Sequence, residues 1–307
     1  MASGERKSNK GNYMKKMLLG ALAVAVACAV FVGVAPVAYA APAYGKVKVA
    51  VTQDFGDAQE VLKLVNANRK KAHLSKLKMD KSLTKAAIQR AAEVGIFVPF
   101  KSPHRRPNGK LSGSVNGKIS YECCAEGYQS PAAVVKGWMG SPPHRRGILL
   151  SSAKSVGIGC VRTGGGDTIW TLEFSGSKAK KVQKSEKVVS YTKTVKAKSA
   201  YLKSKFFKMA SSAYGDFEVG QPGKMSVYYS SKYNVTNTGI SPKSFKWKSS
   251  NPSVISITQT GAVKTNAAGS ATITATSKKG PKITVKKTVR VVAQLDDDDW
   301  AFALGDI

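Results

Sequence analysis

Acidic residues are scarce in this sequence. It contains 18 aspartates and glutamates against 49 lysines and arginines, which gives a formal net charge of +31 at pH 7. In a cytosolic protein so strong a positive charge would indicate nucleic-acid binding. No nucleic-acid recognition motif accompanies it here. Most of the charge is lysine rather than arginine, whose planar fork favours bidentate phosphate contacts. We therefore expect no nucleic-acid partner.

Cysteine is rare as well, with 4 residues in the chain. Cys28 lies in an apolar N-terminal run, which leaves Cys123, Cys124 and Cys160 for the remainder. Three cysteines are too few for a disulfide scaffold. Adjacent cysteines do not readily pair with each other, so two states stay open: one bridge from Cys123 or Cys124 to Cys160, or free thiols throughout.

The N-terminal segment has the pattern of a signal peptide. Two lysines precede an almost continuous apolar run over residues 17–34, and small residues follow at Ala38 and Ala40. We predict cleavage after Ala40, so that residues 1–40 are removed. A transmembrane anchor is the alternative, because the run is near the length that spans a bilayer. The many alanines and glycines in the run favour cleavage.

Export determines which partners are available. Either Met1 or Met14 can be the true start, and in both cases we expect a secreted, extracellular protein that associates with the cell wall. The polyanions found there are cell-wall polymers with phosphate or carboxylate groups, or a host surface. We expect these anionic surfaces as partners of a monomeric protein.

Residues 59–174 show the patterns of a mixed α/β domain. Three segments have helical apolar spacing or a helix start signal, and two more indicate strands joined by a glycine-rich loop. The helices are expected over 59–73, 80–94 and 130–139, and the strands over 156–162 and 168–174. Helices followed by an antiparallel hairpin favour an α+β fold, an α-β-α sandwich, over residues 59–176.

The chain changes character after this domain. Residues 177–208 are rich in lysine, with Glu186 as the sole acid. Self-repulsion and low hydrophobicity predict a lysine-rich linker there, although its valines and tyrosines allow one or two strands. Over 209–293, short alternating segments between turn signals predict an all-β Ig-like sandwich. Residues 294–307 include a run of aspartates and are expected to be a solvated acidic tail.

The chain has 3 histidines, so each can be weighed separately. His73 ends the first expected helix among lysines, where a cation interacts favourably with the helix dipole. His104 and His144 lie in turn-rich segments, with Glu122 between them in the sequence. Two loop histidines and a carboxylate supply a metal site with an open position, or equally a general acid–base pair. Their spacing does not decide between the two.

Several motifs within residues 59–174 occur in the order and spacing of one known family. They are Asn66 to Arg69, Leu77 to Leu83, His104 to Gly109, Glu122, Trp138 to Leu149, Val156 to Gly159 and Trp170 to Phe174. On these motifs the segment resembles a CAP domain of the bacterial type. The family comprises the cysteine-rich secretory (SCP), antigen 5 and pathogenesis-related proteins.

This resemblance implies a cleft in which His104, Glu122 and His144 converge. The three would bind zinc or another divalent cation, or act directly in catalysis. Longer eukaryotic members have a second glutamate after the tryptophan-containing helix. This chain has no acid between Tyr128 and His144, so that fourth member is absent.

The motif around Glu122 departs from the family's Gly-Glu-Asn-Ile. Tyr121 replaces the glycine, and Cys123 and Cys124 replace the asparagine and the isoleucine. These replacements change the surroundings of Glu122. Glu126, four residues further on, is an alternative ligand.

The last domain resembles a bacterial Ig-like module of group 2. Residues 247–254 match its Trp-x-Ser-Ser-Asn-Pro-x-Val, and residues 261–263 and 268–275 match its two later strands. Such modules occur on bacterial surface and secreted proteins as adhesion or spacer units. We expect Trp247 to be a core residue rather than a platform for a ligand.

Two functions stay open for the CAP domain. In the first, it binds a peptide, lipid or glycan in the cleft without turnover. In the second, it is a divalent-metal-dependent hydrolase of extracellular peptide or wall material, in which His104 and His144 hold the cation and Glu122 is third ligand or base. We favour binding, because no serine or cysteine stands in a nucleophile motif.

Overall fold

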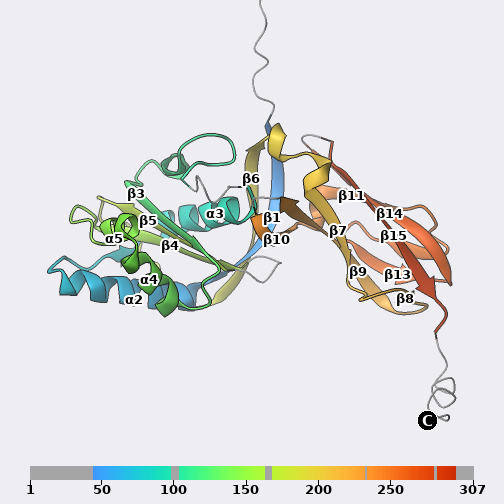
Figure 1. Cartoon of the computed structure of the whole chain (residues 1–307), viewed down its shortest axis with the longest axis horizontal. Helices are drawn as coiled ribbons and strands as arrows, with labels where there is room; N and C mark the ends of the chain where they lie inside the picture. Colours follow the sequence, from blue (N-terminus) through green and yellow to red (C-terminus); the bar gives the residue numbers. More distant parts are fainter. Residues whose placement is uncertain (1–43, 98–103, 163–167, 232–233, 280–281, 295–307) are drawn as a thin grey trace, which may run out of the picture. The chain divides into compact units, whose positions relative to one another are not determined.

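The computed structural model describes residues 44–97, 104–162, 168–231, 234–279 and 282–294 (Figure 1). The expected signal peptide, the glycine-rich hairpin loop and all but the first residue of the expected acidic tail lie outside these ranges. Within them, no helix is long and apolar enough to cross a bilayer.

The mixed α/β part contains the expected helices and the expected hairpin. The helices are α2 (Phe55–Lys71), α3 (Lys81–Phe97), α4 (Pro131–Gly140) and α5 (Pro142–Ile148), and a 3-10 turn, η1 (Ser112–Val115), lies between α3 and α4. The strands are β1 (Tyr44–Asp54), β2 (Lys78–Met79), β3 (Tyr121–Glu126), β4 (Ser155–Arg162), β5 (Thr168–Ser175) and β6 (Val188–Lys198). The hydroxyl of Ser130 caps α4, because it accepts a hydrogen bond from the amide of Ala133 at 3.2 Å.

Helices cover both faces of a largely antiparallel sheet in which the strands run β1-β4-β5-β3. Because side chains alternate along a strand, β4 contributes Val156 and Ile158 to a core with α2 and α4. It contributes Val161 to a second core with α3. The predicted α-β-α sandwich is thereby confirmed.

Two glycines allow α3 to lie directly on β4. A Cβ at Gly157 would come within 2.1 Å of the carbonyl carbon of Leu83, and one at Gly159 within 2.9 Å of the carbonyl oxygen of Ala87. Only glycine permits so close an approach. Arg90 follows Ala87 by three residues on the same helix face, so this packing also brings Arg90 against the sheet.

The Asn-x-x-Arg motif of α2 is structural. The side chain of Asn66 donates to the carbonyl of Leu77 at 3.0 Å and accepts from its amide at 2.7 Å. Arg69 is buried and donates to the carbonyls of Ile148 at 2.8 Å and Leu150 at 2.9 Å. The two side chains therefore pin the segments that follow α2 and α5.

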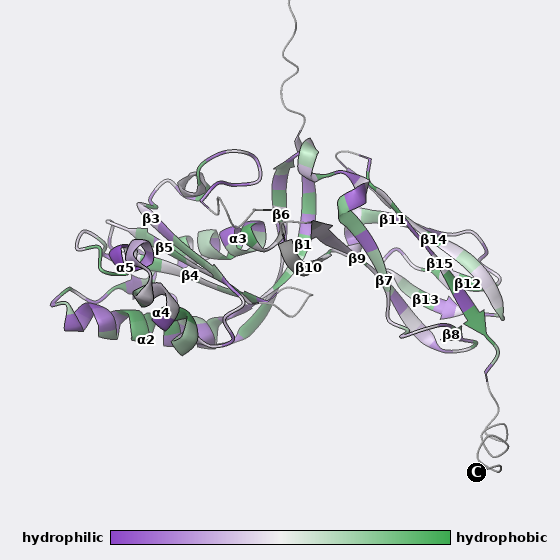
Figure 2. Cartoon of the chain, viewed as in Figure 1, coloured by the Kyte–Doolittle hydropathy of each residue, from purple (hydrophilic) through white to green (hydrophobic). Residues whose placement is uncertain are grey.

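Part of the expected linker over 177–208 is a strand, which its valines and tyrosines allowed. Strand β6 pairs with β1 along the full length of both strands, and Val195 and Ala197 are buried against Val47 and Val49. Small apolar residues alternate with lysines, so one face of the ribbon is buried while the charges stay in water (Figure 2). The sheet also extends before the expected start at residue 59, because β1 precedes it.

The described residues after β6 are mainly strands, as predicted for 209–293. They are β7 (Phe207–Ser211), β8 (Phe217–Glu218), β9 (Pro222–Ser231), β10 (Asn234–Ile240), β11 (Phe245–Ser249), β12 (Ile255–Ile257), β13 (Ala262–Thr265), β14 (Gly269–Ser277) and β15 (Thr284–Val292). One sheet has the order β11-β14-β15-β8. The strands β12-β13-β9-β10 continue the sheet of the mixed α/β part, because β10 pairs with β1 at Ile240 and Val49. Trp247 is 5% exposed and packs edge-on against Phe245, which confirms that it is a core residue.

Candidate functional site

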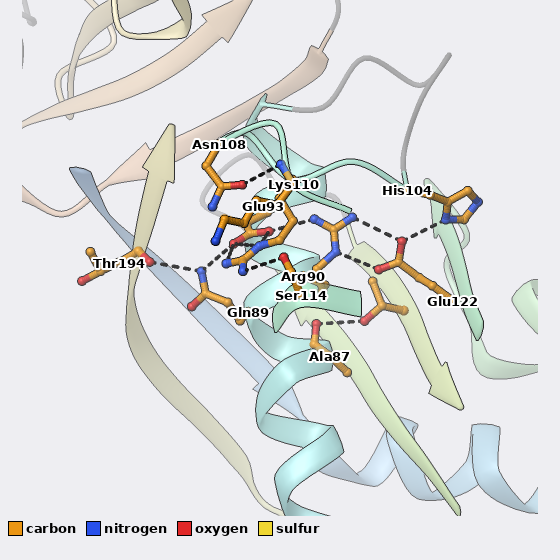
Figure 3. A network of polar contacts seen from close by, with 12 residues as sticks. Ala87, Gln89, Arg90, Glu93, His104, Asn108, Lys110, Ser114, Glu122 and Thr194 are labelled. Carbon is orange, nitrogen blue, oxygen red and sulfur yellow. Dashed lines mark hydrogen bonds and ion pairs between the residues drawn. The ribbon is translucent and has the colours of Figure 1, made fainter. Parts of the chain in front are cut away.

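His104 and Glu122 are in direct contact. His104 lies in the loop after α3, Glu122 is the second residue of β3, and the imidazole Nδ1 is 2.9 Å from a carboxylate oxygen (Figure 3). The side chain of Glu122 is 2% exposed, whereas that of His104 is 53% exposed. A carboxylate can only accept, so Nδ1 carries a proton and Nε2 is the ring nitrogen left for another partner.

Arg90 holds Glu122 from the other side. Its Nε lies 2.7 Å from one oxygen of Glu122 and its Nη2 lies 3.2 Å from the other. Burial acts to raise the pKa of Glu122, but the hydrogen bonds from His104 and Arg90, with the charge of Arg90, outweigh it and lower the pKa to about 2. Glu122 is therefore ionised at neutral pH.

The contacts continue as an alternating chain of charges. Arg90 also bonds Glu93 at 2.8 Å, and Arg106 bonds the same carboxylate at 2.6 Å. The sequence reasoning missed these three residues. Arg90 and Glu93 had a detectable signal, because both stand in a helix whose neighbouring residues are alanine and valine, and charged residues are almost never fully buried unless paired.

A second buried carboxyl lies beside Glu122. Glu173 of β5 is its cross-strand partner and is fully buried. Burial first, and then the charge of Glu122, raise the pKa of Glu173 well above its ordinary value, so this group is a neutral acid. In the described part of the chain, no hydrogen-bond partner engages either carboxyl oxygen of Glu173. Its proton can therefore be donated to Glu122.

His144 lies in α5 and does not join this contact. Its backbone carbonyl accepts from the thiol of Cys123 at 3.7 Å. Cys123 and Glu122 are adjacent in β3, so their side chains leave the sheet on opposite faces. Burial lowers the pKa of His144, and the charge of His104 lowers it further.

The side chains that lie close enough together to share a metal ion are not the predicted set of His104, Glu122 and His144. His104, Glu122 and Cys124 have ligand atoms within 4.8 Å of one another. Both oxygens of Glu122 are engaged by Arg90, whose positive charge repels a cation. Burial raises the pKa of the Cys124 thiol well above its ordinary value. As it stands, this donor set does not fit a divalent cation with Glu122 as a direct ligand.

The three buried cysteines are free thiols. Burial raises the pKa of Cys123 and of Cys160, and nearby carboxylates add to the effect. They are therefore poor nucleophiles, because the thiolate is the reactive form.

A cleft of about 390 Å³ opens beside His104. Its lining residues are His104, Leu111, Ser112, Gly113, Ile119, Ser120, Tyr121 and Glu122. The hydroxyl of Ser120 donates to the carbonyl of Phe174 at 3.2 Å. Within the described ranges no serine or cysteine hydrogen-bonds the imidazole of His104. The cleft thus combines apolar walls with one oriented imidazole.

The architecture is therefore an α-β-α sandwich with a cleft beside its edge strand, followed by an Ig-like β-region. Residues 62–174 match the model of the cysteine-rich secretory protein family, and residues 218–289 match that of the bacterial Ig-like domain, group 2. The chain contains a CAP domain of that family followed by a group 2 Ig-like domain. The resemblance drawn from the sequence is confirmed for both.

Similar proteins cover the CAP part. The uncharacterized protein YkwD of Bacillus subtilis is 33% identical over 122 residues, which is 38% of this chain and 46% of that protein. The chain therefore matches about half the length of this relative. An outer surface protein from Borrelia burgdorferi is 21% identical over 40% of this chain and 93% of its own, with a TM-score of 0.33. An extracellular SCP-domain protein from Bacillus anthracis is 20% identical. The match covers 40% of this chain and 41% of that protein, with a TM-score of 0.33.

Proposed function

We propose that the CAP domain binds an extracellular peptide, lipid or glycan without turnover, and that His104 Nε2 is the fixed polar contact in its cleft. The observation that carries this proposal is the chain His104–Glu122–Arg90. A half-exposed imidazole is held by a buried carboxylate, which is itself held by a buried guanidinium. Such support fixes the tautomer and the direction of the ring before a ligand arrives.

Binding is favoured over hydrolysis by what surrounds the imidazole. The thiols are buried with raised pKa values, and Ser120 is engaged with a backbone carbonyl. A hydrolase without a side-chain nucleophile would need a water activated by a general base or by a metal. Glu122 is not free to ligate, so a metal could be held only by His104 and His144, with Glu122 supporting His104 from behind.

The extracellular location belongs to the same proposal. The predicted signal peptide over 1–40 and the occurrence of group 2 Ig-like modules on bacterial surface and secreted proteins both support it. The charge of +31 supports retention on anionic cell-wall polymers or a host surface.

A ligand panel tests the cleft. Purified protein would be titrated with labelled peptidoglycan stem peptides, wall glycan fragments and single-chain lipids, and compared with His104→Ala and Leu111→Ser. We expect one class to bind and to lose about tenfold in affinity in each variant, which corresponds to about 1.4 kcal/mol. His73→Ala is the matched histidine control. A ligand that binds wild type and the two cleft variants equally would contradict the proposal.

A further inference from the structure

A second cavity, of about 380 Å³, is lined by five lysines. They are Lys46, Lys48, Lys243, Lys278 and Lys279. No acidic side chain lines this cavity. Over the described residues none of the five forms an ion pair. So many uncompensated ammonium groups around one hollow create a strongly positive potential, because a cleft with low-dielectric walls concentrates the field.

One wall of this cavity is the exposed face of the β1–β6 ribbon. Lys46 and Lys48 alternate with buried valines, so both side chains leave the sheet on the solvent side. Lys46 stands directly opposite Lys196 of β6. Like charges in that position destabilise a sheet, and the contact of Lys196 with the ring of Tyr44, at 4.8 Å, offsets this only in part. A bound anion would relieve the remaining repulsion.

The opposite wall comes from the 3-10 turn η4 (Pro242–Ser244) and the β14–β15 connection. Backbone hydrogen bonds fix both walls. The amide of Ser241 donates to the carbonyl of Lys48 at 2.8 Å, and the amide of Lys278 donates to the carbonyl of Ser244 at 2.9 Å. The lysines are therefore gathered before any ligand binds.

A hydroxyl in the same lining lacks a partner. The Oγ of Ser244 is buried and makes no hydrogen bond in the described part of the chain. A buried polar group without a partner costs free energy. An oxyanion in the cavity would accept hydrogen bonds from this hydroxyl and from the surrounding ammonium groups.

We propose that this lysine cavity binds the phosphate groups of an extracellular phosphodiester polymer that carries no bases. Each phosphodiester group of such a polymer carries one negative charge on two free oxygens, and lysine binds phosphate as a point charge. Lysine acts as a point charge without the directional fork of arginine, so it accepts a repeating chain in many registers. Among the described residues no aromatic side chain lines the cavity, whereas single-stranded nucleic acid is held by stacking on aromatic rings.

Fluorescence anisotropy with labelled poly(glycerol phosphate) tests the proposal at moderate salt. The variant Lys46→Gln/Lys48→Gln/Lys243→Gln removes three cavity lysines. Lys136→Gln/Lys248→Gln/Lys264→Gln removes three exposed lysines outside the lining, with the same change in net charge. We expect the cavity variant to bind about tenfold more weakly or worse and with a smaller dependence on salt, since fewer charge contacts are made. The control should stay within about twofold of wild type.

Competition and folding controls make each outcome decisive. Polyphosphate should displace the probe, while poly-glutamate, single-stranded DNA and anionic vesicles should displace it poorly. Circular dichroism would check that both variants fold, and Ser244→Ala, which keeps all charges, should weaken binding as well.

An equal loss of affinity in the two triple variants would mean diffuse electrostatic attraction and overturn the proposal. Equal displacement by poly-glutamate would overturn the choice of phosphate. His104→Ala should leave this binding unchanged, so the result is separate from the cleft.

Discussion

Glu173 stands directly across the sheet from Glu122, and both carboxyl side chains are buried. Glu122 is ionised because Arg90 and His104 bond it. Glu173 has no comparable donors, so burial and the neighbouring charge keep it protonated. The pair therefore places a neutral acid behind the carboxylate that orients the cleft imidazole.

The pKa shifts of Glu122 and Glu173 have opposite effects on how the stability of the protein depends on pH. The pKa of Glu122 is lowered from 4.5 to about 2, so its contribution is present above pH 4.5 and is lost as the pH falls toward 2. The pKa of Glu173 is raised. Above pH 4.5 the folded protein then holds a proton that the unfolded chain releases, so stability falls as the pH rises, by up to about 1.4 kcal/mol per pH unit.

Replacing Glu173 by glutamine should therefore stabilise the protein at neutral pH. The amide keeps the shape and can still donate to Glu122, but it holds no proton that the unfolded chain would release. We expect a free energy of unfolding about 1–4 kcal/mol higher at pH 7.5 and nearly unchanged at pH 4, measured by urea denaturation across that range. Glu60→Gln, at an exposed position, is the control. A variant with the wild-type dependence on pH would show that Glu173 is ionised.

Arg90 offers a test of the charge network itself. Arg90→Met removes the cation between Glu93 and Glu122, and breaking such a buried pair costs about 3–5 kcal/mol. The loss should shrink as the pH falls, because the stranded carboxylates can take up protons.

Arg69→Met is the matched comparison for Arg90→Met. Arg69 is equally buried, but its partners are backbone carbonyls, such as those of Ile148 and Leu150. Carbonyls do not titrate, so the loss in this variant should not be relieved by acid. The measurement is urea denaturation of both variants at pH 7 and pH 4.5. Parallel behaviour of the two arginine variants would contradict the network.

The sequence alone predicted the layers of the fold and two members of the site, for identifiable reasons. Apolar spacing and caps are local, so the helices of the CAP domain and the strands of the Ig-like domain were predictable. The contact of His104 with Glu122 depended on family motifs. Arg90, Glu93 and Glu173 were missed because their roles depend on which strands and helices become neighbours. The valines and tyrosines of 177–208 allowed a strand such as β6, but its pairing with β1 depends on a partner strand far away in the sequence.

His73 has a backbone role that its sequence position did not reveal. Its φ is 56°, in the left-handed region. Its amide donates to the carbonyl of Lys70, and the next amide, of Leu74, donates to Arg69. This is the Schellman arrangement that ends many helices, in which glycine is preferred.

Changing His73 to glycine should stabilise the protein. A side chain in the left-handed region costs about 1–2 kcal/mol, so we expect His73→Gly to raise the free energy of unfolding by about 1 kcal/mol. His73→Ala keeps the Cβ and should give no such gain. Chemical denaturation of the three proteins at pH 8 compares them. A gain in the alanine variant equal to that in the glycine variant would assign the effect to the imidazole instead.

The zinc prediction is sharpened by the geometry. His104 Nδ1 is bound to Glu122, so only Nε2 can ligate, and the lowered pKa of His144 keeps that ring neutral to more acidic pH than its ordinary value of 6.5. We expect calorimetry to find zinc binding that is lost in His104→Ala and in His144→Ala.

Supporting residues behind a metal-bound histidine typically change affinity 10–100-fold, so Glu122→Gln should weaken binding by roughly that factor without abolishing it. Acid should weaken binding, because a protonated ring cannot coordinate. His73→Ala should bind like wild type. Equal zinc binding in all variants would remove the cleft histidines as ligands, and complete loss in Glu122→Gln with the fold intact would make Glu122 a direct ligand.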